Sequence, residues 1–259
     1  MRPRQVGQAR RALEAARWFR ATPARRLKDL APEGTLHPRG VGLTFDDGPD
    51  PRWTPAVLRL LAKADARATF FVCGRAARRH PDLVRAAADD GHAIGGHTWD
   101  HVRVDQLDGA GWRREVDGAH DLLEDLLGQP IRYFRPPWGV LSLSAQARLH
   151  HRRLAVALWS VWGEDTSHTD SARVAALVEA GLEPGAIVLL HDACGNLLAP
   201  GGSLPPGAHG DRGVTVAALP AILGALRARD LLPVALPAQP LGVVRSLRGE
   251  RPTAPLAGV

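Results

Sequence analysis

The sequence has little of what would place it in a membrane, in a disulfide-rich fold or among secreted precursors. Its 259 residues include only two cysteines, Cys73 and Cys194, so we expect free thiols rather than a disulfide framework. No run approaches the roughly 20 apolar residues that a membrane-spanning helix needs. No continuous apolar stretch follows the basic first residues, so we expect no secretory signal and a cytoplasmic protein, or an extracellular one if a leader is missing.

A concentrated patch of positive charge is also lacking over most of the chain. The net charge is +6, but the basic residues are mostly Arg and are scattered, with their densest cluster in the first 28 residues. Binding to single-stranded nucleic acid combines a basic groove with aromatic rings that stack on bases. The seven Trp residues are not interleaved with basic runs, so we expect no nucleic-acid partner.

Apolar segments of strand length alternate with amphipathic helical segments from about residue 40 onward. This alternation is typical of an α/β fold with a parallel sheet. Because the units follow one another without a break, we expect a single barrel of about seven strands rather than two domains. The expected strands are Gly40–Phe45, Arg67–Cys73, His92–His97, Ile131–Arg135, Leu154–Trp159, Ala186–His191 and Leu231–Leu236.

The two ends of the chain lie outside this pattern. Residues 1–38 are predicted to form an N-terminal extension with a short amphipathic helix, residues 39–237 the catalytic domain, and residues 238–259 a tail. Residues 195–213 are rich in Gly, Pro and Leu and are predicted to form a long surface loop, of the kind that often binds ligands.

Two adjacent carboxylates follow the first expected strand. Asp46 and Asp47 precede Gly48–Pro49, a dipeptide that ends the strand in a turn. On such a turn the two side chains point in different directions, so that one binds a metal while the other accepts a proton. A plain turn without function is the alternative interpretation.

Two histidines follow the third expected strand at a spacing of four. His97 and His101 would lie on one face of a helical turn and could bind one ion, although this spacing also occurs by chance on surface helices. With Asp47 they would form a three-ligand set that leaves a coordination position for water. His191, at the end of another apolar strand, is placed to donate a proton, or else has a structural role.

These segments, taken in order, resemble the motifs of the polysaccharide deacetylases, the family of the NodB homology domain and carbohydrate esterase family four. The motifs lie between Thr44 and His191, and residues 68–72 and 91–95 are also typical. The resemblance implies a distorted (β/α) barrel and a metal-dependent hydrolase that acts on the carbon–nitrogen bond of an acetylated amino sugar.

The resemblance also implies a role for each residue that matches a motif. Asp46 corresponds to the general base and His191 to the general acid. Asp47, His97 and His101 correspond to the metal ligands, for which zinc suits best and cobalt, nickel or manganese are acceptable.

Four further residues match the third and fifth motifs of the family. Arg135 would orient Asp46 through a charge-assisted hydrogen bond. Trp138 would hold the oxyanion with its backbone N–H, and Pro137 and Leu189 would line the substrate pocket together with it.

The acid that supports His191 is open between two candidates. Asp165 corresponds to the aspartate of the fourth motif, but Thr166 follows it where the family commonly has Trp, and Asp170 is a rival.

The expected reaction is the release of acetate from N-acetylglucosamine units of a chitin-, peptidoglycan- or glycoconjugate-like carbohydrate, by a monomer in the default case. Two alternatives stay open at this point. The protein could be an esterase that removes O-acetyl groups from xylan, or a barrel that binds glycans without catalysis.

Overall fold

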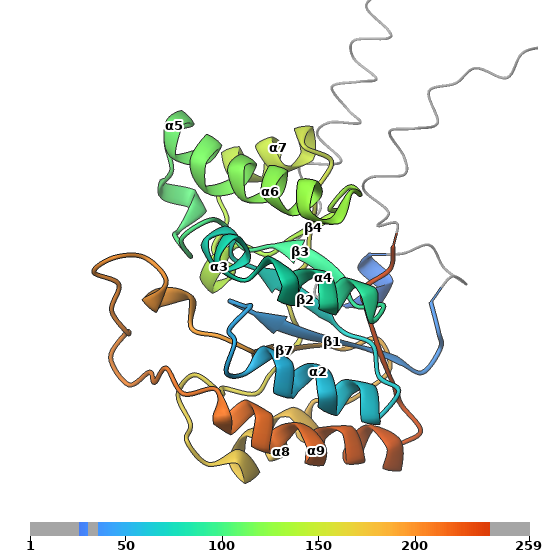
Figure 1. Ribbon diagram of the computed structural model, residues 1–259. Coiled ribbons are helices and arrows are strands. Elements are labelled where there is room, and N and C mark those ends of the chain that lie inside the picture. Colours follow the sequence, from blue (N-terminus) through green and yellow to red (C-terminus); the bar gives the residue numbers. More distant parts are fainter. Residues whose placement is uncertain (1–25, 31–35, 239–259) are drawn as a thin grey trace, which may run out of the picture.

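A computed structural model describes residues 26–30 and 36–238 of the chain. Helices surround a single sheet of eight strands, each of which pairs in parallel with its neighbours (Figure 1). The strands are β1 (Gly40–Asp46), β2 (Thr69–Val72), β3 (Ala93–Gly96), β4 (Tyr133–Phe134), β5 (Ala155–Val156), β6 (Val161–Trp162), β7 (Ile187–His191) and β8 (Leu232–Val234).

Local sequence signals explain several helix boundaries. Pro55 lies in the first turn of α2, where its missing N–H costs no hydrogen bond, and Gly128 ends α6 in the left-handed conformation. The helices are α2 (Thr54–Lys63), α3 (Gly74–Arg79), α4 (Pro81–Asp89), α5 (Gly109–Trp112), α6 (Gly118–Leu127), α7 (Leu143–His151), α8 (Ser171–Ala180) and α9 (Gly213–Ala228). Shorter turns are η1 (Leu27–Asp29), η2 (Val104–Gln106), η3 (Arg113–Asp117, a π-helical segment), η4 (Pro137–Gly139) and η5 (Gly195–Leu197).

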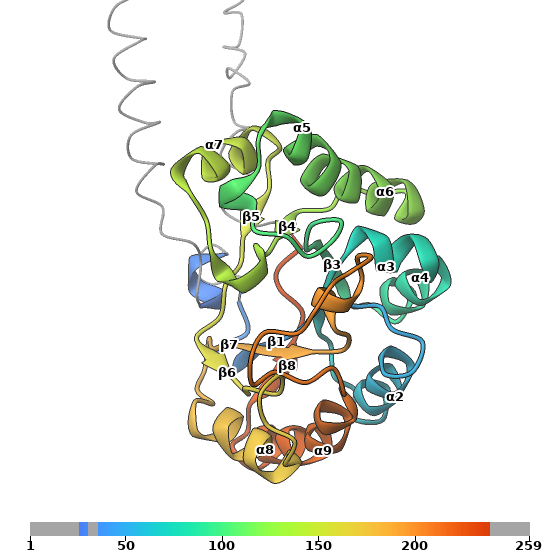
Figure 2. The same cartoon turned by 90° about the vertical axis from the view of Figure 1, so that its left-hand side faces the viewer.

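The strand order makes the sheet a distorted barrel. Seven strands follow one another as β5-β4-β3-β2-β1-β7-β6, and β8 pairs with the beginning of β1. Figure 2 shows the helices arranged around these strands. Within the described residues no strand pairing joins β5 to β6, so the barrel is open there. The predicted single barrel with about seven parallel strands is confirmed.

Residues of β1 alternate between two environments, as a strand requires. Val41, Leu43 and Phe45 are buried in the core between the sheet and the helices. The intervening residues face the barrel interior, where both Thr44 and Asp46 hydrogen-bond to the guanidinium of Arg135. The alternation of side chains along β1 therefore brings Asp46 to the interior at the strand's carboxyl end.

Some predicted elements differ from the structure. The strand expected at Leu154–Trp159 is only Ala155–Val156, and a separate short strand, β6, was not predicted. Residues 97–101 form an irregular loop and not the expected helical turn. The helix expected within residues 1–38 falls at Val6–Ala16, which lies outside the described residues.

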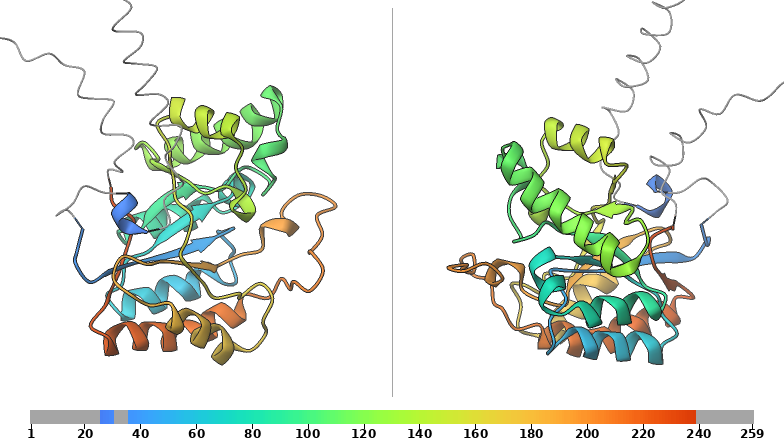
Figure 3. Two further views of the ribbon diagram at one scale, coloured as in Figure 1. Left: turned by 180° about the vertical axis from the view of Figure 1, so that it is seen from behind. Right: turned by 45° about the horizontal axis from the view of Figure 1, so that its top comes forward.

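Three other observations bear on the sequence-based expectations. Cys73 and Cys194 are both free, as predicted. None of the described helices has the length and apolar character needed to cross a membrane. Residues 195–212 contain only the short η5 turn and form a long loop that extends from the side of the barrel where the strands end (Figures 1 and 3).

Candidate active site

The pairing of β1 with β7 joins two of the predicted catalytic residues. The register places Asp46 opposite His191 and Thr44 opposite Leu189. Val188 and Leu190 lie in the core between sheet and helices, so the alternate residues Leu189 and His191 face the interior. The carboxyl ends of these two parallel strands therefore present a carboxylate and an imidazole side by side.

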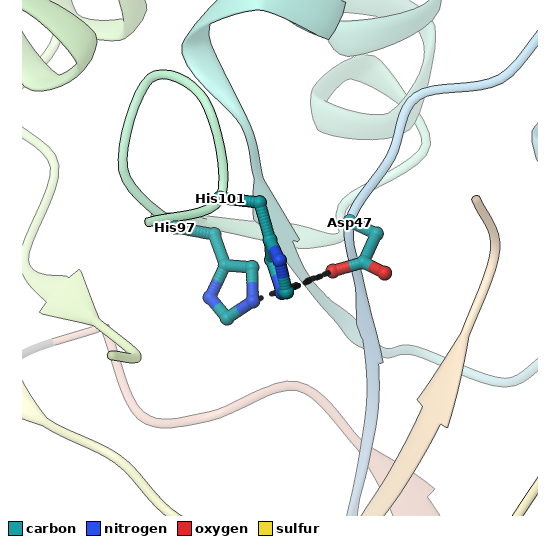
Figure 4. Close-up of side chains that lie close together, drawn as sticks. All are labelled: Asp47, His97 and His101. Atoms are coloured by element: carbon teal, nitrogen blue, oxygen red, sulfur yellow. Dashed lines mark ion pairs between the residues drawn. The ribbon is translucent and has the colours of Figure 1, made fainter. Parts of the chain in front are cut away.

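Asp47, His97 and His101 converge on one point (Figure 4). Oδ1 of Asp47 lies 3.4 Å from Nε2 of His97 and 3.3 Å from Nε2 of His101, and all three side chains are buried. Asp47 lies directly after β1, whereas both histidines lie in the loop after β3. Three potential metal ligands from two separate segments thus face one another.

The other ring nitrogen of each histidine faces an oxygen atom. Nδ1 of His97 lies 2.7 Å from the carbonyl oxygen of Arg135, and Nδ1 of His101 lies 3.0 Å from Oδ1 of Asn196. Both oxygens accept hydrogen bonds, so each Nδ1 carries the proton and each Nε2 presents its lone pair. This is the tautomer that a metal-binding histidine requires.

The residues fit a divalent cation. Oδ2 of Asp47 accepts a hydrogen bond of 2.8 Å from the backbone N–H of Gly195, but the buried Oδ1 has no hydrogen-bond donor among the described residues. This carboxylate oxygen and the two imidazole lone pairs face one another without a positively charged partner. A divalent cation between them would provide that partner.

Electrostatics keep the Asp47 and His101 side chains in their metal-binding protonation states. Burial opposes ionisation of Asp47, but the neighbouring His101 and His97 outweigh it and hold the pKa of the carboxyl well below its usual range. Burial lowers the pKa of His101 to about 4, although the charge of Asp47 opposes this shift. At neutral pH, therefore, Asp47 is ionised and His101 is neutral.

The loop that carries the two histidines is held by contacts with distant residues. The backbone N–H of Arg75 donates to the carbonyl oxygen of Trp99, and the Arg75 side chain forms an ion pair with Asp100. The N–H of Asp100 donates to the buried Glu115 carboxylate at 2.9 Å. With φ angles of 63° at Thr98 and 54° at His101, the loop turns sharply and brings both imidazoles to the same side without a helix.

Asp46 is bound by a fully buried arginine. Nη1 of Arg135 donates to Oδ1 of Asp46 at 2.7 Å, while Nε and Nη2 donate to the carbonyl oxygens of Ala157 and Leu158. The guanidinium also lies 4.0 Å from the centre of the Phe71 ring. Oδ2 of Asp46 lies 3.8 Å from Nε2 of His97, so the carboxylate spans the distance between the arginine and the metal-ligand cluster.

His191 pairs with Asp165 and not with the rival Asp170. Nδ1 of His191 lies 2.8 Å from Oδ1 of Asp165, whose Oδ2 accepts from the His191 backbone N–H and from the Thr215 hydroxyl. Asp170 instead caps α8 by accepting from the N–H of Ala172. Burial lowers the pKa of His191, but the charge of Asp165 more than compensates and raises it to about 9.

The predicted pocket residues lie around this cluster. The Trp138 ring lies with its centre 4.5 Å from that of His101 and is 47% exposed, while its backbone has a φ of 56°. Pro137, which precedes Trp138 in the chain, is buried, and Leu189 is buried on β7, two residues before His191. Trp162, at the end of β6, pairs in register with Leu189 and is also exposed.

Several residues that contact the site were not among the sequence-based candidates. Asn196 and Gly195 contact the metal-ligand set, and Thr215 contacts Asp165. The buried Arg212 donates to the carbonyl oxygens of Asp165 and Ala193. Asp192 is buried beneath the Gly48 turn. These residues belong to no spacing pattern, so only the folded chain shows their positions.

Comparisons with known proteins agree on one family. The family model described as polysaccharide deacetylase matches residues 33–156. The chain is 35% identical over 207 residues to a chitooligosaccharide deacetylase of Azorhizobium caulinodans, covering 78% of this chain and 95% of that protein. It is 30% identical over 165 residues to a peptidoglycan-N-acetylglucosamine deacetylase of Bacillus cereus, covering 64% and 60%. A crystal structure of a peptidoglycan N-acetylglucosamine deacetylase matches with a TM-score of 0.69 at 28% identity, over 80% of this chain and 90% of that one.

Proposed function

The chain belongs to the polysaccharide deacetylase family, and on this basis we propose that it removes N-acetyl groups from N-acetylglucosamine units of an oligo- or polysaccharide in a metal-dependent reaction. The observation that supports this most directly is the gathering of Asp46, His191 and the Asp47–His97–His101 cluster at one edge of the sheet. Hydrolysis of an amide needs a base to activate water and a separate acid to protonate the amine, and these residues provide both.

Asp47, His97 and His101 would hold the metal, for which we propose zinc. Two imidazoles and one carboxylate are a typical ligand set for catalytic zinc. When bound, the ion would lower the pKa of a water molecule and polarise the acetyl carbonyl. The buried surroundings of the three ligands fix their geometry before the substrate arrives.

Asp46 would take the proton from the attacking water. Its Oδ2 faces the metal-ligand cluster, while its Oδ1 is occupied by Arg135 at 2.7 Å. The arginine thus leaves one oxygen of the carboxylate available and fixes its direction. This arrangement favours a base in a defined position over a mobile carboxylate.

His191 would protonate the departing amine with its Nε2. Its Nδ1 is held by Asp165, and the raised pKa of about 9 keeps the ring protonated at neutral pH. An amine is a poor leaving group unless it is protonated. An imidazolium that already carries its proton can supply that proton as the carbon–nitrogen bond breaks.

Substrate binding would use the residues around this cluster. The exposed Trp138 ring would contact a sugar face, its backbone N–H would donate to the developing oxyanion, and the apolar Leu189 and Pro137 would surround the acetyl methyl. The named relatives act on chitooligosaccharides and on peptidoglycan N-acetylglucosamine, which supports an N-acetylglucosamine substrate here.

The test is acetate release from N-acetylglucosamine oligomers and from peptidoglycan. The protein is stripped with a chelator and then given zinc back, and Asp46→Asn and His191→Ala are compared with the wild type. We expect zinc-restored release that falls at least ~100-fold in both variants. Asp65→Asn is the matched control, since this carboxylate is 94% exposed and lies before the start of β2, whereas the cluster lies where the strands end. A folded wild type that binds zinc but releases no acetate from these substrates would contradict the proposal.

A further inference from the structure

The first turn of the long loop after β7 contacts two of the three proposed metal ligands. The N–H of Gly195 donates to Oδ2 of Asp47 at 2.8 Å, and Oδ1 of Asn196 lies 3.0 Å from Nδ1 of His101. Asp47 and His101 come from two other parts of the chain, so residues 195 and 196 link them from a third. Figures 1 and 3 show the loop projecting outward from this end of the barrel.

The turn approaches the ligands so closely that it requires glycine at position 195. A Cβ atom at this position would lie 2.5 Å from Cγ of His101 and 2.8 Å from Oδ1 of Asp47, which is closer than real Cβ atoms lie. The absence of a side chain at Gly195 therefore lets the backbone pack against the cluster. This contact brings the next residue, Asn196, within hydrogen-bonding distance of the imidazole.

Two aromatic rings of the described residues also contact the His101 ring. One ring contact is with Trp138, whose centre lies 4.5 Å away, and another is with His97 at 5.1 Å. Neither contact distinguishes one ring nitrogen from the other. The hydrogen bond to Asn196 does, because an amide oxygen accepts only from a protonated Nδ1 and so leaves Nε2 with its lone pair.

We propose that Asn196 is a positioning residue that fixes the tautomer and orientation of His101 and thereby strengthens metal binding. The inference rests on the proposed metal-dependent function. Partners of this kind, which hydrogen-bond to a metal-binding histidine, typically change metal affinity by 10- to 100-fold on mutation.

This role links the metal site to the loop at residues 195–212. The other end of the loop is also anchored, because the buried Arg212 donates to the carbonyl oxygens of Ala193 and Asp165 at 2.7 and 3.0 Å. Both ends of the loop thus lie on catalytic groups, one on the metal ligands and the other on the partner of His191.

The experiment measures zinc affinity of the full chain by competition with a chromophoric chelator. Asn196→Leu keeps the size of the side chain but removes the acceptor, whereas Asn196→Asp keeps an acceptor oxygen. We expect Asn196→Leu to bind zinc about 10- to 100-fold more weakly and Asn196→Asp to bind it at least as tightly as the wild type. Leu197→Ala is the matched control, because the neighbouring Leu197 is 49% exposed.

A second measurement on the metal-free protein reports the tautomer itself. Long-range ¹⁵N–¹H NMR spectra distinguish a protonated Nδ1 from a protonated Nε2, and we expect His101 to lose its single Nδ1–H form in Asn196→Leu. Unchanged zinc affinity in Asn196→Leu would overturn the inference, as would equal weakening in Asn196→Leu and Asn196→Asp. A wild type that binds no zinc would instead contradict the proposed function.

Discussion

Replacing Asp165 with Asn removes the negative charge that keeps the buried His191 imidazole protonated. In the wild type this charge outweighs burial and raises the pKa of His191 from 6.5 to about 9. Without it, burial is opposed only by the smaller effects of Asp47 and Asp46, so the pKa of His191 falls. A fall of ~2 pH units takes the protonated fraction at pH 8 from ~90% to ~10%, which lowers the rate of a reaction that needs the protonated form by about 10-fold.

The assay is the pH dependence of kcat/KM for acetate release between about pH 6 and about pH 10. We expect the alkaline limit of activity to move toward acid by about 2 pH units in Asp165→Asn. Asp170→Asn is the control, since Asp170 caps α8 and has no contact with His191 among the described residues. A lower rate with an unmoved alkaline limit would refute the assignment of His191 as the proton donor.

The same pair predicts how the free energy of unfolding depends on pH. The folded pKa of His191 lies above the unfolded value, so its contribution is fully present below about pH 6.5 and is lost as pH rises through about 9. A shift of this size corresponds to roughly 3 kcal/mol. The stability difference between the wild type and Asp165→Asn is therefore largest near the acid end of this window, as urea unfolding at several pH values will show.

Three further predictions concern the buried charges of the site. Arg135→Met leaves the Asp46 carboxylate buried without its partner, so we expect a loss of about 3–5 kcal/mol in the free energy of unfolding, measured with urea. Burial raises the pKa of Asp192 from 3.8 to about 7, so the free energy of unfolding falls as pH rises between these two values. The fall is roughly 4 kcal/mol at most, and Asp192→Asn should remove it when urea unfolding is compared at the two ends of this pH range. Zinc at about 100 times its Kd should stabilise the wild type by about 2.7 kcal/mol in thermal unfolding, and Asp47→Ala should abolish this effect.

The main strands could be predicted because their residues are apolar over whole segments. β1 and β7 pair over five residues, and both were predicted from the sequence to within a residue or two. β6 has only two residues, which is too short for any periodicity to appear. α3 and α7 also show no clear amphipathic pattern in the sequence. α3 has only six residues, three of them Arg, and α7 buries only Ala145 and Leu149. Length and apolar content decide what sequence patterns reveal.

The candidate site shows the same limit at the level of single residues. Asp47, His97 and His101 were grouped from their residue types and order, and the structure brings these three together. The helical turn expected at 97–101 was wrong because contacts with α3 and with Glu115, far away in sequence, determine that loop. Local spacing cannot describe a loop that distant contacts fix.

The partners of Asp46 and His191 distinguish the proposed base from the proposed acid. The two residues lie opposite each other in the β1–β7 register, so their position along the sheet does not distinguish them. Asp46 is paired with the guanidinium of Arg135, which holds one of its two oxygens, whereas His191 is paired with the carboxylate of Asp165, which favours the imidazolium. The raised pKa of His191 keeps a proton donor in the site at neutral pH, beside the second oxygen of Asp46 as the proposed acceptor. Reversing the charge of either fully buried partner would set two like charges against each other, which would destabilise the site as well as remove one of the two functions.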